Sequence, residues 1–261
     1  MQLHVAVGQI DLALGDRAAN LATVQTSAAQ AAAGGAELLV LPELWGSGYD
    51  LERAAELSDA LGEGLFAETA RLAAQHKLAI CGSLLERRSD GIYNTAVTFD
   101  AAGTLHGVYR KTHLIGLMAE ERYLRPGAGA EVYPMGWGAT ASAICYDLRF
   151  PELFRRYALA GARVVLLPAE WPIRRIEHWR TLLRARAIEN QCVVVACNRV
   201  GSDRDNTFGG CSAIIDPWGK VLAEGGEQPA LLTATLDLAE IDAVREFLPI
   251  FRDRRPEVYG A

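Results

Sequence analysis

The chain has 261 residues, of which half are hydrophobic and 22% are charged, and its formal net charge is −6. This hydrophobic fraction supports a large core and excludes an intrinsically disordered chain. The negative charge and the absence of a long Lys/Arg block argue against a protein that binds nucleic acid or a membrane surface, so the expected partner is a small molecule.

The N-terminal residues have no basic start before an apolar run, and no stretch of about 20 apolar residues follows. We therefore expect neither a signal peptide nor a transmembrane helix, and a location in the cytosol. No Pro/Gly/Ser-rich linker divides the sequence, which predicts one domain over residues 1–261. The cysteines are widely spaced and form no CxxC pair, so neither a disulfide framework nor a zinc site is expected.

Strand and helix patterns alternate over the first 85 residues. The pattern predicts strands at 3–10, 37–43 and 78–85, with helices at 18–33 and 61–76 between them. Gly34 and Gly35 end the first helix, because glycine adopts the backbone conformations that close a helix at little cost. Two further strand-like segments, 93–100 and 104–111, are separated by a short connection that contains glycine, which predicts an antiparallel hairpin.

A second alternating block follows this hairpin. An apolar run leads to Cys145, and Pro151 with Glu152 predicts a helix start, because proline is tolerated in a first turn and acids suit the positive end of the helix dipole. The later elements are a strand at 163–171, a helix at about 175–191, a strand at 192–200 and short edge strands in the tail. Two alternating blocks joined by a hairpin predict an α/β fold with two sheets packed face to face and helices outside.

Cys145 stands at the predicted corner between a strand and a helix, where open α/β folds place reacting groups. Backbone amides and any nearby cation lower the pKa of a thiol, so we expect this thiol to be easy to activate. A free cysteine is more often inert packing than a nucleophile, and Cys145 taken alone does not decide between them. The other four cysteines lie in apolar runs and are expected to resist alkylation: Cys81, Cys192, Cys197 and Cys211.

Charged groups follow two other predicted strand ends, with Glu43 after LVLP and Lys111 after GVYR. Equivalent ends of neighbouring strands would bring these groups and Cys145 into one pocket. There a carboxylate takes the thiol proton, a lysine binds the oxyanion, and the thiolate attacks a carbonyl or nitrile carbon. Taken alone, Glu43 is more typical of a helix start or a surface acid, and Lys111 of a solvated charge.

The segments LPELW, YRKTHL and ICYDLRFPEL resemble, in order and spacing, the three catalytic motifs of the nitrilase, or carbon-nitrogen hydrolase, superfamily. The resemblance covers essentially the whole chain, including HWRTLLRARAIENQ (178–191) and the RRPEVYG tail (254–260). It implies a four-layer αββα sandwich, no metal or organic cofactor, and a homodimer or larger homo-oligomer. It also implies a catalytic triad of Glu43, Lys111 and Cys145.

The same superfamily has a second pocket glutamate, commonly a few residues before a Pro-Gly pair. In AEERYLRPG, both Glu120 and Glu121 precede Pro126 and Gly127. Counting back from this pair favours Glu120, and Glu121 stays the alternative.

The sequence around Cys145 resembles the Nit-type amidases, which include ω-amidases acting on 2-oxoglutaramate or 2-oxosuccinamate, and deaminated-glutathione amidase. Such substrates carry an acid group, for which a guanidinium is suited. Arg175 is the first candidate and Arg174 the second, although both are equally compatible with a basic first turn of a helix. Trp171 and Tyr146 are expected to line the pocket, and the Tyr146 amide is a candidate oxyanion donor.

The leading functional hypothesis is an amidase that acts through a thioester and releases ammonia. A carbamoylase or nitrilase of the same superfamily is an alternative, and a non-catalytic binding subunit is a third. Tyr49 is more typical of loop packing than of a pocket residue.

Overall fold

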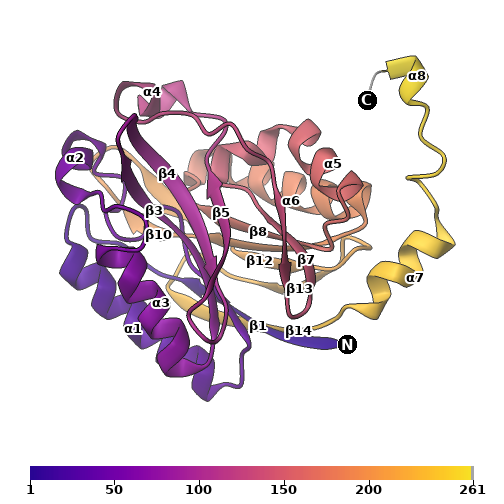
Figure 1. Ribbon diagram of the computed structural model, residues 1–261, viewed down its shortest axis with the longest axis horizontal. Helices are drawn as coiled ribbons and strands as arrows, with labels where there is room; N and C mark the ends of the chain where they lie inside the picture. The colour runs from indigo at the N-terminus through magenta and orange to yellow at the C-terminus, as the bar shows by residue number, and fades with distance from the viewer. Residues whose placement is uncertain (260–261) are drawn as a thin grey trace.

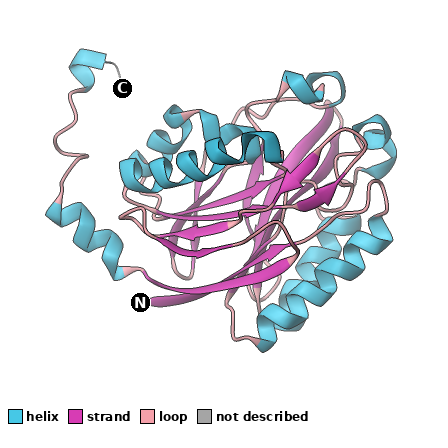
Figure 2. Cartoon of the chain, turned by 180° about the vertical axis from the view of Figure 1, so that it is seen from behind, coloured by secondary structure: helices cyan, strands magenta, loops and turns pink. Residues whose placement is uncertain are grey.

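The protein is described here by a computed structural model that covers residues 1–259. Gly260, which ends the RRPEVYG segment, and Ala261 lie outside the described residues. The chain forms two six-stranded sheets that pack face to face, with helices on both outer faces (Figures 1 and 2). The predicted αββα sandwich is therefore confirmed. Within residues 1–259, no helix is long and apolar enough to cross a membrane.

The first sheet has the strand order β14-β1-β2-β3-β4-β5. Its strands are β1 (Gln2–Gln9), β2 (Leu38–Val40), β3 (Ala79–Arg88), β4 (Gly91–Phe99), β5 (Leu105–Arg110) and β14 (Ala230–Asp237). The first three strands run parallel, and β4 and β5 form the predicted antiparallel hairpin. The sequence predicts β14 only as a short edge strand, whereas it pairs with all of β1 and so joins the two ends of the chain.

The second sheet has the order β13-β12-β9-β8-β7-β6. Its strands are β6 (Val132–Met135), β7 (Gly138–Ser142), β8 (Val164–Ala169), β9 (Val193–Asn198), β12 (Ala213–Ile215) and β13 (Val221–Glu224). As in the first sheet, the central strands β7, β8 and β9 run parallel. The sequence analysis missed β6, whose Pro134 is tolerated because β6 lies at the sheet edge. A separate short pair is formed by β10 (Val200–Ser202) and β11 (Thr207–Gly209).

Four helices form the outer layers. The first sheet is covered by α1 (Arg17–Ala33) and α3 (Gly64–His76), and the second by α5 (Pro151–Leu159) and α6 (Ile176–Asn190). The shorter helices are α2 (Ala54–Leu57), α4 (Glu120–Tyr123), α7 (Ala239–Phe247) and α8 (Pro256–Tyr259). The 3₁₀ turns are η1 (Leu51–Arg53), η2 (Gly116–Met118), η3 (Cys145–Arg149) and η4 (Ile173–Arg175). The segment that ends in α8 extends away from the sheets (Figure 1).

Apolar side chains fill three core layers between these four layers of secondary structure. In β1, Val5 and Val7 pack between the two sheets, whereas Ala6 packs toward α1 and α3. This alternation follows from the strand geometry, in which successive side chains point to opposite faces. On the other side, Phe154 and Trp179 bury α5 and α6 against the second sheet. The two sheets and the outer helices are therefore closely packed against one another.

The carboxyl ends of β2, β5, β7 and β8 meet at one edge of the sandwich, where the amide of Glu43 donates to the carbonyl of Ala169 at 3.4 Å. The sequence predicts a strand over 37–43, but β2 ends at Val40. Proline at position 42 has no N–H to continue the hydrogen-bond ladder, which explains the early end. Glu43 therefore lies in a loop that crosses between the two sheets.

Candidate active site

A lysine lies between two carboxylates at this edge. Lys111 Nζ donates to Glu43 Oε1 and to Glu120 Oε1, both at 2.7 Å, and all three side chains are fully buried. The predicted convergence of Glu43 and Lys111 is therefore observed. Within residues 1–259, no group of three or more His, Cys, Asp or Glu side chains is arranged to hold a metal ion.

The Glu43 carboxylate is held by further donors from both sheets. Asn94 Nδ2 donates to Oε1 at 2.8 Å, and the backbone amide of Glu170 donates to Oε2 at 2.9 Å. The same carboxylate lies close enough to the Cys145 thiol to raise its pKa. Glu43 is thus held in one orientation by donors from both sheets.

Cys145 begins the turn η3 in a left-handed backbone conformation, with φ +43°. For a non-glycine residue this conformation is strained, and it persists only where surrounding contacts enforce it. The buried carboxylate of Asp147 supplies such contacts: it accepts bonds from the Ile144 amide at 2.9 Å and the Tyr109 hydroxyl at 2.8 Å. The same carboxylate accepts a hydrogen bond from the backbone amide of His113 and forms another with His113 Nδ1, two residues after Lys111. Asp147 thereby ties the turn η3 to the end of β5.

Burial raises the pKa of the Cys145 thiol well above its ordinary value, and the nearby Glu43 carboxylate raises it further. Lys111 and the Glu170 amide act in the opposite direction but do not overcome these effects. The net shift of this pKa is upward, opposite to the lowering expected from nearby amides and a cation, and the resting thiol keeps its proton.

The pKa values of Glu43 and Lys111 are shifted as well. Burial raises the pKa of Glu43, since Lys111 only partly offsets the loss of hydration. Burial opposes the charge on Lys111, but Glu120 and Glu43 raise its pKa well above the ordinary value. The lysine is therefore a permanent cation next to a carboxylate of increased basicity.

The two candidate positions for the second glutamate differ in their surroundings. Glu120 begins α4 and is fully buried; its Oε2 accepts from the Ile115 amide at 2.7 Å, and its Oε1 accepts from the hydroxyl of Tyr49. The side chain of Glu121 is exposed. Only Glu120 joins the buried cluster.

The pocket beside Cys145 has a volume of about 10 Å³. Its lining residues are Ile115, Met118, Cys145, Tyr146, Arg149, Trp171, Pro172 and Arg175. A cavity needs at least about 10 Å³ to hold one water molecule, so binding of any larger molecule requires lining side chains to move. The structure brings Tyr146, Trp171 and Arg175 together at this pocket, whereas Arg174 is exposed and does not line it.

Arg149 is a pocket residue that the sequence analysis missed. Its guanidinium lies 4.7 Å from the centre of the Trp171 ring. Burial lowers its pKa, and the neighbouring charge of Arg175 lowers it further. The sequence carries no distinct signal for this role, because a single arginine beside Phe150 has no pattern of its own.

A sequence model of the carbon-nitrogen hydrolase family matches residues 4–246. The chain belongs to the carbon-nitrogen hydrolase family. It is 45% identical over 225 residues to the 2-oxoglutaramate amidase of Bacillus subtilis (strain 168), covering 86% of this chain and 87% of that protein. It is 37% identical over 263 residues to the deaminated glutathione amidase of Homo sapiens, covering 94% and 80% of the two chains.

The fold of this hydrolase is also similar to a solved structure. A CN-hydrolase superfamily protein from Xanthomonas campestris superposes with a TM-score of 0.91 and 30% sequence identity, and the match covers 98% of each chain. The predicted superfamily is therefore confirmed.

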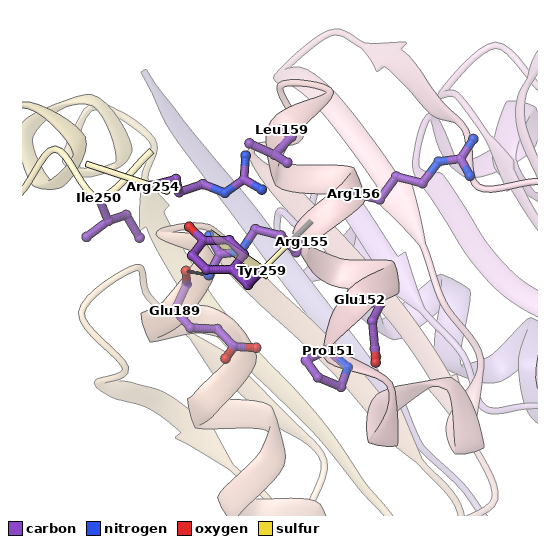
Figure 3. Close-up of a pocket in the computed structure, with 9 residues that line it drawn as sticks. All are labelled: Pro151, Glu152, Arg155, Arg156, Leu159, Glu189, Ile250, Arg254 and Tyr259. Atoms are coloured by element: carbon purple, nitrogen blue, oxygen red, sulfur yellow. Dashed lines mark hydrogen bonds between the residues drawn. The ribbon is translucent and has the colours of Figure 1, made fainter. Parts of the chain in front are cut away.

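A larger hollow of the hydrolase, of about 730 Å³, lies between α5, α6 and the C-terminal segment (Figure 3). It shares no lining residue with the pocket beside Cys145. Its lining includes Arg155, which donates to the backbone carbonyl of Glu189 at 2.5 Å, and Tyr259 of α8. No cysteine or lysine lines this hollow, so it lacks the groups needed for thioester chemistry.

The other cysteines of the hydrolase differ in exposure. Burial raises the pKa of Cys81 and Cys192 to about 12, and that of Cys197 well above its ordinary value. Cys211 is only partly buried, which revises the expectation that it resists alkylation. When the folded Cys145→Ala variant is treated with iodoacetamide, we expect peptide mass spectrometry to detect labelling at Cys211 alone. Labelling at the three buried positions before unfolding would contradict this packing.

Proposed function

We propose that this protein is a cysteine-dependent amidase that hydrolyses the C–N bond of a small carboxylated amide through a thioester and releases ammonia. The proposed substrates are monoamides of 2-oxo-dicarboxylic acids, such as the 2-oxoglutaramate named for the Bacillus subtilis relative. One observation carries the proposal: Arg149 and Arg175 line the pocket beside Cys145, and neither is paired with a carboxylate within residues 1–259. Two adjacent cations without counter-ions favour an anionic ligand.

In the first half-reaction, Glu43 takes the proton of the Cys145 thiol while the sulfur attacks the amide carbon. Lys111 and the backbone amide of Tyr146 bind the oxyanion of the tetrahedral intermediate. Glu43 then gives the proton to the departing nitrogen and the C–N bond breaks. Ammonia leaves, and the acyl group stays on Cys145 as a thioester.

In the second half-reaction, Glu43 takes a proton from a water molecule as its oxygen attacks the thioester carbon. Lys111 again binds the oxyanion. The C–S bond breaks, the sulfur of Cys145 regains a proton from Glu43, and the carboxylic acid leaves. The same base thus serves both steps without a net change in the enzyme.

The two pocket arginines are expected to determine selectivity for the acid group. Arg175→Met or Arg149→Met should raise KM for 2-oxoglutaramate by roughly ten- to a hundredfold, because a charge-assisted hydrogen bond contributes about 1.5–3 kcal/mol. For a neutral short-chain amide, KM should change less than about twofold, since no charged contact is lost. Lysine in place of either arginine should restore only part of the affinity, since its ammonium lacks the planar fork of a guanidinium.

Arg174→Met is the matched control, because Arg174 precedes Arg175 directly but is exposed. It should leave both KM values near those of the unmodified enzyme. If the Arg149 and Arg175 variants treat charged and neutral amides alike, the acid group is bound elsewhere or the substrate is not an acid.

The activity itself is tested with a panel of ω-amides, a nitrile and an N-carbamoyl compound, assayed for ammonia. We expect release of ammonia from 2-oxoglutaramate or 2-oxosuccinamate, without carbon dioxide and without turnover of the nitrile. Turnover of the carbamoyl compound or the nitrile instead would favour the other hydrolase branches. Inertness toward the whole panel, with no thioester detected by mass spectrometry, would favour a binding subunit.

We also propose that residues 1–261 act as one catalytic domain and that the chain forms a homodimer or larger assembly. Leu159 and Tyr259, which line the hollow in Figure 3, are 45% and 61% exposed, and exposed apolar side chains favour burial against a partner. Light scattering after size-exclusion chromatography measures the assembly. The five unpaired cysteines further support a location in the reducing cytosol.

A further inference from the structure

Tyr49 lies in the loop after β2 with a left-handed backbone, φ +73°. Its side chain is 9% exposed, and its hydroxyl donates a hydrogen bond to Glu120 Oε1. Burial raises the pKa of Tyr49 well above its ordinary value, and the carboxylates of Glu120 and Glu43 raise it further. The hydroxyl therefore keeps its proton and acts as a donor. Loop packing, the role expected from the sequence, does not account for this hydrogen bond.

Glu120 connects Tyr49 to the catalytic lysine. Its Oε1 accepts from Lys111 Nζ at 2.7 Å as well as from Tyr49, and its Oε2 accepts from the Ile115 amide at 2.7 Å. The terminal torsion of a glutamate is broad, so these donors determine which way the carboxylate faces. Lys111 uses a second N–H for Glu43. An ammonium has three donors, which leaves one for the substrate oxygen.

We propose that Tyr49 is a positioning residue for amide hydrolysis: by holding Glu120, it fixes the direction of the Lys111 N–H that binds the oxyanion. The inference rests on the proposed function, since it concerns the same site. An oxyanion donor is effective only if it already points to where charge develops, so a small reorientation of Lys111 lowers the rate more than it weakens substrate binding.

Two features distinguish this role from packing. A phenylalanine ring would fill the same space, so packing does not require the hydroxyl. The ring of Tyr49 also borders a hollow of about 410 Å³, next to Leu51 and Met118, and is therefore not enclosed on every side. The loop nevertheless adopts left-handed conformations at both Leu44 and Tyr49, which place the hydroxyl in the buried cluster.

Tyr49→Phe tests the inference with the removal of one oxygen atom. We expect kcat to fall about tenfold while KM changes less than about twofold, because the lost interaction serves the transition state. The melting temperature should stay close to that of the unmodified protein. Tyr93→Phe is the matched control, because the Tyr93 hydroxyl also donates to a carboxylate, that of Asp90 at 2.9 Å, at a partly buried site outside the cluster. Its kinetics should be unchanged.

A double-mutant cycle separates an action through Glu120 from a general disturbance. Because Tyr49 acts through Glu120, Tyr49→Phe should cause no further loss of kcat in a Glu120→Gln background. The alkylation rate of Cys145, followed by peptide mass spectrometry, should also be the same in Tyr49→Phe as in the unmodified protein, because Asn94 and the Glu170 amide hold Glu43 independently of Tyr49.

Three results would overturn the inference: a normal kcat in Tyr49→Phe, an additive loss in the Glu120→Gln background, or a parallel loss of Cys145 alkylation. The measurements use 2-oxoglutaramate, or whichever amide of the panel the unmodified enzyme hydrolyses fastest. A failure of 2-oxoglutaramate as substrate would contradict the proposed function alone, and the role of Tyr49 would still be decided with the other amide.

Discussion

Cys145→Ala is expected to abolish ammonia release from 2-oxoglutaramate while the protein stays folded. The thiol supplies the covalent step, and no other described cysteine lines the pocket beside Cys145. Alanine fits the site because the Cys145 side chain packs in an apolar environment and only one sulfur atom is removed. Steady-state assays measure the activity, and circular dichroism with thermal unfolding measures the fold.

Cys211→Ala is the control for this prediction, since Cys211 is the most accessible of the remaining cysteines. It should retain full activity. Near-normal turnover by purified Cys145→Ala would rule out the thioester mechanism, whereas an unfolded variant would indicate a structural role for the thiol.

Glu43→Gln is expected to lower kcat by at least about a hundredfold, the scale of losing a general base. Glutamine keeps the size of the side chain but cannot take the proton that burial holds on Cys145. Lys111→Met should cause a loss of similar size, because the oxyanion then lacks its charged donor. The double variant should be little worse than either single variant, since members of one catalytic unit are not additive.

The pH dependence tests Glu43 separately. The base must be ionised, so kcat/KM of the unmodified enzyme should fall as the pH falls through the pKa of Glu43. Burial raises this pKa above the ordinary value of 4.5, so the acid limb should lie at a higher pH than for an exposed glutamate. The limb should be absent from the residual activity of Glu43→Gln. An unchanged limb in the variant would assign it to another group.

Much of the fold could be predicted because its central strands are short, apolar on both faces and separated by amphipathic helices. Segments such as Val193–Asn198 have this character, which is typical of buried parallel strands. The partner of β14 could not be predicted in this way, because local pattern contains no information on pairing between the two ends of a chain. β6 could not be predicted either, because it contains Pro134 and proline is usually evidence against a strand.

The residues of the candidate site could be predicted from the sequence, but the pKa shift of its thiol could not. Motif spacing identified Glu43, Lys111 and Cys145, and counting back from Pro-Gly favoured Glu120. The direction of the pKa shift at Cys145 depends on burial and on the charge of Glu43, neither of which sequence order reveals. Arg149 was overlooked because a single arginine beside an aromatic residue has no pattern of its own.

The pairing of β14 with β1 also affects how the protein is made on the ribosome. β1 acquires its outer neighbour only after β14, which is far later in the chain, has been translated. Until then the nascent chain presents β1 as an open edge, with unpaired backbone groups that attract other strands. Late synthesis of this one segment therefore sets the earliest moment of complete folding, and premature termination before residue 230 would leave an aggregation-prone product.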